Sequence, residues 1–282
     1  MGINIGGWRF AALAVTAFGL GLSCSDGKTA DSETEARETL FESALSGQVK
    51  PVAELAYQAL TQSRRQLTDE QLAVAEKIVR REFGEEKLEH RILTKLADAS
   101  QNEHLEAVLD WLRSPLGERA TNARAAASDP ATLSAVKSFV EEKNANPPSR
   151  RRVELIERFN ESALTSEISS NTLLLAALGA AVMVDAIRPA DQRIGPEELR
   201  ASTDARQQLV IPIFNEMSSI VYLLVFRDFS DEELEAVVQF AESDDGRWYY
   251  QTTASALVES LLETANGIGE TYVAALSEKP AS

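Results

Sequence analysis

The sequence predicts an all-α fold made of two homologous multi-helix repeats packed together. Apolar residues recur at the three- and four-residue spacing of a helix from Arg37 onward. Aromatic residues make up only 6% of a chain that is rich in alanine, leucine and glutamate, which favours helices. One segment occurs twice, and its copies carry helix start signals. Alternation of strand and helix patterns is absent, so a nucleotide-binding α/β fold is not expected.

The repeated segment lies at residues 100–117 and again at residues 230–246. With Leu105 aligned to Leu234, the copies share Leu-Glu-Ala-Val, an aromatic residue six places on, a serine and a glycine. A second match, Glu-Ser-Ala-Leu, ends at Leu45 and at Leu164. Two copies of one helical unit are therefore expected: repeat 1 at 37–142, a linker with Pro147 and Pro148 at 143–152, repeat 2 at 153–276, and a polar tail at 277–282.

The first half contains several helix start and stop signals. Thr68 and Gln71 form a capping-box pattern before an apolar stripe. Ser114-Pro115 predicts the end of one helix and the start of the next, because serine accepts from free N–H groups and proline suits the first helical position. Asp129-Pro130 repeats this pattern. Helices are expected around residues 40–45, 52–59, 72–79, 88–96, 105–112 and 133–140.

The second half is expected to contain the central helix of the fold. Residues 173–184 carry no polar side chain and are too few to span a bilayer, which predicts a buried helix. A channel for a lipid or an apolar ligand is the alternative interpretation. The last long helix is expected to begin near Asp244, and Gly267 and Gly269 are expected to end or kink it.

The N-terminus has the pattern of an export signal. Residues 10–22 are apolar or small and follow Arg9, which predicts a signal peptide at residues 1–23. Cys24, the only cysteine, precedes an acidic stretch that predicts a flexible tether at residues 24–36. This arrangement resembles the lipobox of bacterial lipoproteins, in which the cysteine receives a diacylglyceryl group. The resemblance implies a lipid anchor at Cys24, and Ser25 favours the outer membrane of a Gram-negative bacterium. Ordinary signal cleavage and an uncleaved anchor are the alternatives.

Charge and motif content exclude several classes of function. The net charge of −16 disfavours nucleic acid and bare anionic membrane as partners, because phosphates require lysine and arginine. One cysteine and two separated histidines, His90 and His104, give no zinc-binding spacing, so no metal or cofactor is expected. The chain has no Walker motif, no dinucleotide fingerprint and no Gly-x-Ser-x-Gly elbow. No catalytic residues are therefore assigned, and an enzyme is not expected.

The densest aromatic site follows the second copy of the repeated segment. Arg247, Trp248, Tyr249 and Tyr250 are consecutive, so on one helix they cannot all face the core. A seam between helices is one interpretation, and a surface for a glycan, a peptide or a partner helix is the other. Acidic clusters at Asp228, 231–233 and 244–245 are interpreted as helix N-terminal charges, with calcium binding or a carboxylate pair as alternatives. Residues 150–152, three consecutive arginines, are interpreted as a solvated linker edge or an anionic-ligand patch.

The repeated segment resembles a bacterial family of helical domains of unknown function. That family carries an acidic-Leu helix, then Phe-Tyr-x-Ser-Pro-x-Gly, then another amphipathic helix. Residues 103–117 keep the Glu-x-Leu run and Ser-Pro-x-Gly, with Trp111-Leu112 in place of Phe-Tyr, and the second copy keeps Phe240, Ser243 and Gly246. The resemblance implies an all-α fold and an envelope location, and it supplies no catalytic residue. The motif residues Ser114, Pro115, Gly117, Ser243 and Gly246 are expected to form helix corners.

Taken together, these patterns predict a lipid-anchored envelope protein that is held on the periplasmic side of the membrane. We expect a non-catalytic module that binds an envelope protein partner or supports assembly, with the candidate interaction surface at residues 247–250. The alternative is a module for a small molecule or lipid, with an apolar pocket between the repeats lined by residues 173–184. A hydrolase that uses carboxylates is a third alternative.

Overall fold

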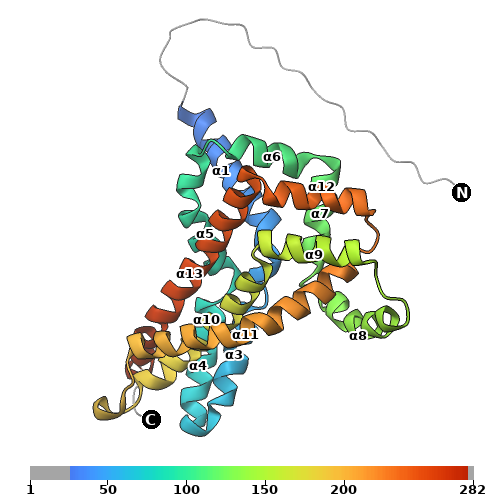
Figure 1. Cartoon of the computed structure of the whole chain (residues 1–282). Helices are drawn as coiled ribbons and strands as arrows, with labels where there is room; N and C mark the ends of the chain where they lie inside the picture. The colour runs from blue at the N-terminus through green and yellow to red at the C-terminus, as the bar shows by residue number, and fades with distance from the viewer. Residues whose placement is uncertain (1–25, 279–282) are drawn as a thin grey trace, which may run out of the picture.

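The computed structural model describes residues 26–278, and these residues are helical with no strand, which confirms the all-α prediction (Figure 1). Cys24 and the predicted signal peptide lie outside the described residues. The first half consists of α1 (Asp26–Ala44), α2 (Ser46–Val49), α3 (Val52–Gln62), α4 (Asp69–Glu82), α5 (Glu85–Lys95), α6 (Leu105–Arg113), α7 (Pro115–Ala126) and α8 (Pro130–Ala145). The second half consists of α9 (Arg150–Ser162), α10 (Thr165–Ala186), α11 (Pro196–Val225), α12 (Asp231–Glu242) and α13 (Asp244–Ser277). Three short 3-10 helices, Arg64–Gln66, Ala97–Gln101 and Ala190–Gln192, lie in the connections.

Helix α10 is the centre of the fold, as the sequence predicts. It packs against α3, α11 and α13, and most of its side chains are buried (Figure 1). Gly179 allows this close packing, because a Cβ atom there would lie 2.6 Å from the ring of Phe83 on the neighbouring chain segment. A helix that is apolar all round and mostly buried is the expected core of a domain of this size.

The two halves interlock and do not form separate domains. Helix α13 packs against α4 and α5 of the first half, while α7 and α8 pack against α11 of the second half. One continuous hydrophobic core joins them. The order of helices also corresponds between the halves, but α10, α11 and α13 are single long helices where the first half has pairs of shorter ones. The duplication therefore stays a prediction.

Several predicted boundaries differ from the structure. Helix α1 begins at Asp26 and buries Ala36, so the predicted tether is helical over residues 26–36. The linker is shorter than predicted, because α8 continues to Ala145 and α9 begins at Arg150. The last helix was expected to end or kink at Gly267 and Gly269, and an end there is wrong, because α13 continues through both glycines to Ser277. Gly269 packs against Val182 of α10, where a Cβ atom would lie 2.9 Å from the side chain. This glycine allows close packing of two helices and does not end one.

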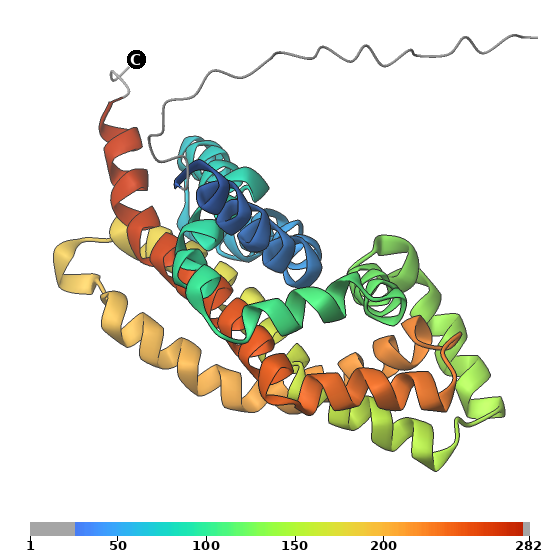
Figure 2. The same ribbon diagram turned by 90° about the horizontal axis from the view of Figure 1, so that it is seen from above.

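Two segments, α10 and residues Ala190–Val225, are long and apolar enough to cross a membrane by length and composition. In α10 the apolar residues are covered by other helices, which is the usual reason for such a composition in a core helix. The second segment contains α11, of which only a small part is buried. Figure 2 shows α11 running along one edge of the molecule.

Candidate functional site

The first copy of the repeated segment forms a tight corner between α6 and α7. Ser114 ends α6 and caps α7, because its Oγ accepts a hydrogen bond from the backbone N–H of Gly117 at 3.0 Å. The same hydroxyl donates to the carbonyl oxygen of Trp111 at 2.6 Å. Pro115 occupies the first position of α7, where its missing N–H costs no hydrogen bond. A Cβ atom at Gly117 would lie 1.9 Å from the Trp111 carbonyl oxygen, so the corner requires glycine.

The second copy forms the same corner between α12 and α13. Ser243 Oγ accepts from the N–H of Gly246 at 3.0 Å and donates to the carbonyl oxygen of Phe240 at 2.7 Å. A Cβ atom at Gly246 would also lie 1.9 Å from that carbonyl oxygen. The serine and the glycine of both motifs therefore have structural roles that local geometry explains completely.

The two corners face each other in the structure. The rings of Trp111 and Phe240, which are aligned positions of the two copies, stack with centroids 4.5 Å apart and planes 11° apart. Polar pairs flank the stack: Arg119 donates to Glu233 at 2.6 Å, and His104 Nδ1 lies 2.7 Å from a carboxylate oxygen of Asp245. The repeated segments thus hold the two halves together.

The stack should have a measurable coupling energy. In a double-mutant cycle of Trp111→Ala and Phe240→Ala, we expect the two residues to couple by about 0.5–1.5 kcal/mol, as aromatic pairs do beyond their buried area. Urea unfolding of the wild type, both single variants and the double variant measures this coupling. Strictly additive losses would show that the rings are neighbours without a specific interaction.

The predicted interaction surface at residues 247–250 is only partly exposed. Tyr249 and Tyr250 are 1% and 3% exposed, so they belong to the core and cannot form a binding surface. Trp248 is half-buried beside the ring of His104, at a centroid distance of 6.0 Å, and exposed Arg247 pairs with Asp244 at 2.7 Å. Two adjacent residues of α13 can both be buried because helices pack on both sides of this turn. The seam interpretation fits these residues better than the surface interpretation.

Arg124, which no sequence pattern singles out, lies against the two buried tyrosines. The guanidinium of Arg124, on α7, lies over the ring of Tyr250 with its carbon 4.9 Å from the ring centroid. Burial lowers the pKa of Arg124, because it disfavours the charged guanidinium. The electrostatic interactions with Tyr250, Tyr249 and Tyr222 have a larger, opposite effect, so the pKa of Arg124 lies above its ordinary value. Tyr249 also hydrogen bonds to Ser43 of α1 at 2.9 Å. Nothing in the alanine-rich sequence around Arg124 indicates this contact, since its partners are about 100 or more residues away.

The acidic clusters of the second half are structural ion pairs. The side chain of Arg152, from the predicted linker edge, donates to Asp231 and to the carbonyl oxygen of Phe229, both at 2.9 Å. Arg119 lowers the pKa of Glu233 through a side-chain hydrogen bond, and Arg158 does the same for Glu242. A general acid requires a raised pKa, so these carboxylates do not have the properties of a catalytic pair. Among the described residues, no group of three or more histidine, cysteine and acidic residues is placed to hold a metal ion.

One buried carboxylate, Glu82, is surrounded by cations. It is 7% exposed and pairs with Lys87, with Arg81 at 2.9 Å and with Arg91 at 3.7 Å. Burial opposes its charge, but hydrogen bonds from Lys87 and Arg81 outweigh it and hold the pKa of Glu82 below its ordinary value of 4.5. Glu82, at the end of α4, therefore links this helix to α5 through its ion pairs with Lys87 and Arg91.

This pKa shift gives a prediction for the pH dependence of stability. Because the folded pKa lies below the unfolded one, the contribution of Glu82 is fully present above about pH 5 and is lost as the pH falls below 4.5. At pH 7 we expect Glu82→Gln to lower the free energy of unfolding by about 1–2 kcal/mol. Urea unfolding of both proteins at pH 7 and pH 3.5 checks this, and a difference that does not shrink at low pH contradicts it.

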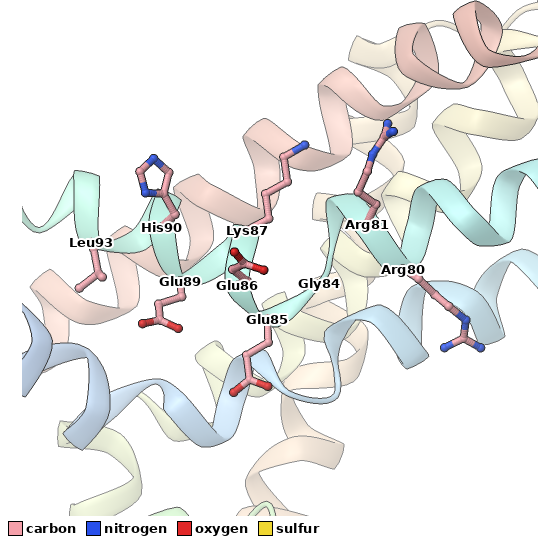
Figure 3. A pocket seen from close by; sticks show the side chains of 9 residues that line it. All are labelled: Arg80, Arg81, Gly84, Glu85, Glu86, Lys87, Glu89, His90 and Leu93. Carbon is pink, nitrogen blue, oxygen red and sulfur yellow. The ribbon is translucent and has the colours of Figure 1, made fainter. Parts of the chain in front are cut away.

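A hollow of about 900 Å³ lies at this corner, lined by Arg80, Arg81, Gly84, Glu85, Glu86, Lys87, Glu89, His90 and Leu93. Figure 3 shows that these side chains do not converge on one point. Arg80, Glu85 and Glu89 extend to one side of the ribbon, whereas Lys87 and His90 extend to the other. Such a hollow offers no set of groups that could act together on one substrate.

A different hollow lies between α9, α10 and α11. It has a volume of about 550 Å³ and is lined by Glu157, Asn160, Glu161, Glu167, Asn215, Glu216 and Ser219. A second hollow of about 480 Å³ adjoins it, because both are lined by Glu157, Glu216 and Ser219. The 550 Å³ hollow is lined by four glutamates and by no lysine or arginine. None of these four glutamates belongs to an ion pair of the described residues. The second hollow is also lined by Lys143, so we call only the 550 Å³ hollow the acidic groove.

Beside the acidic groove, α11 exposes an apolar stripe to solvent. Its residues recur every four positions: Ala201, Ala205, Leu209, Ile213 and Met217. The three large side chains are 74%, 57% and 54% exposed, respectively. Isolated exposed apolar residues are ordinary, but a regular row of them on one helix face is typical of a surface that another molecule covers. We call this row the α11 stripe.

The chain matches no family model, no curated protein and no solved structure. The resemblance of the repeated segment to a family of helical domains therefore stays a prediction. The α11 stripe and the acidic groove are the features of the described residues that their own packing does not explain.

Proposed function

We propose that this protein is a non-catalytic, partner-binding protein of the bacterial envelope, and that it binds its partner through the α11 stripe. The observation that carries the proposal is the exposure of Leu209, Ile213 and Met217 on one face of a helix of 30 residues. Large apolar side chains are covered when a partner binds, and covering them supplies much of the binding free energy. The paired carboxylates and the spread side chains of the largest hollow favour binding over catalysis.

The alternative function, a module with an apolar pocket between the halves, has less support. Residues 173–184 belong to α10, which is packed against α3, α11 and α13. None of the hollows described above is lined by these residues. Leu173 is exposed, but a ligand could reach the buried residues of this segment only if these helices separated.

The partner can be captured in cells with a photo-crosslinking residue at position 213, using position 273 as the matched control. Val273 is also an exposed apolar residue, but it lies on α13 away from the stripe. We expect one discrete adduct from position 213, none from position 273, and loss of the adduct when Leu209→Asp is added. The identified partner, once purified, should bind the Leu209→Asp variant at least about 100-fold more weakly, because a charge then enters a desolvated contact. Equal adducts from both positions, or unchanged affinity, would refute the proposal.

The proposed location rests on the lipobox-like sequence around Cys24. We expect the wild-type chain in membrane fractions and a Cys24→Ser variant in soluble fractions, because the cysteine thiol is the site of lipid attachment. Metabolic labelling with a radioactive fatty acid should mark only the wild type. Labelling or membrane association that survives the substitution would show that Cys24 is not the anchor, without bearing on the α11 stripe.

A further inference from the structure

We propose that the partner segment that covers the α11 stripe is a basic amphipathic helix. Its apolar side would cover Leu209, Ile213 and Met217, and lysine or arginine residues along one edge would reach the acidic groove. This inference rests on the proposed function, because it assigns a chemistry to the partner. It is carried by the shape of the stripe and by the placement of the unpaired glutamates.

The shape of the α11 stripe fits a helix. Its residues are spaced by four, so they form one of the ridges that pack into the grooves of a second helix. The large side chains from Leu209 to Met217 turn by only about 80° around α11, so they share one face about 12 Å long, at 1.5 Å per residue. A partner helix of two to three turns covers this length. Ala201 and Ala205 continue the row but turn away from this face, because residues spaced by four rotate about 40° per step.

A carboxylate adjoins the stripe at Glu216. Glu216 is exposed, adjoins Met217 in sequence and lies one helical turn from Ile213. It also lines the acidic groove, which continues to Glu157 and Glu161 on α9 and to Glu167 on α10. Glu216 therefore connects the stripe to the other three carboxylates, because all four line the same hollow. Since none is already paired with a cation, each can pair with a lysine or an arginine of the partner.

Charge also decides between the possible occupants. A second copy of this chain would bring a net charge of −16 and a second acidic groove to the same contact. An anionic membrane surface would be repelled by the same glutamates, because helices that lie on such membranes are rich in lysine and arginine. A basic amphipathic helix complements both the α11 stripe and the acidic groove, whereas the other two occupants complement only the α11 stripe.

The test uses the purified full-length chain in detergent solution and two fluorescent 18-residue helical peptides as probes. Both peptides carry leucine at helical spacing, with lysine at the remaining positions of one peptide and glutamate in the other. We expect the lysine peptide to bind and the glutamate peptide not to bind in fluorescence anisotropy at 150 mM salt. Glu161→Gln/Glu216→Gln should weaken binding of the lysine peptide about five- to tenfold, because two charge pairs are lost.

The matched control is Glu86→Gln/Glu89→Gln, which removes the same charge from α5, where neither glutamate is in an ion pair. It should change the affinity less than twofold, and all variants should keep the wild-type melting temperature within a few degrees. Equal weakening by both pairs would show attraction by net charge alone and would overturn the inference.

The remaining outcomes separate this inference from the proposed function. If Leu209→Asp/Ile213→Asp abolishes binding of the lysine peptide and Glu161→Gln/Glu216→Gln does not change it, the basic character of the partner is refuted and the stripe stays a binding surface. A dimer in sedimentation velocity that Leu209→Asp abolishes would identify a second copy as the occupant and overturn the inference. Binding of the wild type to anionic vesicles, lost in the same variant, would overturn it in favour of lipid.

Discussion

Gly246→Ala is expected to lower the free energy of unfolding by about 3 kcal/mol, although it adds a single methyl group. The added Cβ atom would lie 1.9 Å from the carbonyl oxygen and 2.8 Å from the carbonyl carbon of Phe240. Both are backbone atoms of the last turn of α12, so no side chain can rotate away. The corner must open, which strains the Ser243 cap and moves the Phe240 ring relative to Trp111. For a chain of this length, thermal unfolding should shift downward by about 6–12 °C.

The matched control is the same substitution at Gly267, in the same helix. An added Cβ atom at Gly267 meets nothing within 4 Å, and the position is exposed. Alanine loses less conformational freedom than glycine when a helix forms, so Gly267→Ala should stabilise the protein by about 0.5–1 kcal/mol. Opposite signs for the two variants would establish that the corner requires glycine. Equal effects would show that α13 responds only to helix propensity.

Phe159→Ala is expected to destabilise the protein by about 3–5 kcal/mol, the usual range for a large buried ring. Phe159 is 0% exposed, and its ring makes edge contacts with Tyr222 of α11 and with Phe226, which follows the end of α11, at centroid distances of 5.3 and 5.2 Å. Tyr250 of α13 lies 6.5 Å away in the same arrangement. Removing the ring leaves a cavity where α9, α11 and α13 meet, and it also removes three aromatic contacts.

Phe159→Leu is the control for this cavity, because leucine keeps most of the volume and loses only the ring contacts. We expect it to cost about 1–1.5 kcal/mol. Guanidinium unfolding followed by far-ultraviolet circular dichroism measures both variants. If Phe159→Ala costs no more than Phe159→Leu, the helices collapse into the space and the aromatic cluster does not determine the packing. Tyr250 and Tyr222 also contact Arg124, which belongs to the first half. The stability loss of Phe159→Ala therefore also measures how much this cluster contributes to the packing between the two halves.

The local features of the fold could be predicted from the sequence because their causes are local. The corners at Ser114 and Ser243 depend on a serine hydroxyl and a glycine three residues apart, and the capping box of Thr68 depends on residues within one turn. The burial of α10 follows from its uniformly apolar composition. The predicted end of the last helix at Gly267 and Gly269 was wrong, because glycine in a helix is also tolerated where helices pack closely or where the position is exposed.

The binding surface could not be predicted in the same way. Apolar spacing identifies a helix face, but it does not tell whether another helix covers that face, so the α11 stripe gives the same pattern as a core face. Glu216 follows the other three glutamates of the acidic groove by about 50–60 residues, and only the packing of α9 and α10 against α11 brings it to them. The aromatic run at residues 247–250 has the composition of a contact surface, yet Arg124 and Ser43 cover two of its tyrosines.

The sequence by itself therefore determined the helical class, the corner motifs and the buried character of α10, because residues within a few turns of each other set them. It also predicts an export signal and lipid attachment at Cys24, and both predictions concern residues outside those that the structure describes. Only the tertiary structure decided which apolar faces are covered, which charges are paired and which are free. The physical reason is that burial and ion pairing depend on contacts between residues far apart in the chain, as Arg124 with Tyr250 and Arg119 with Glu233 show.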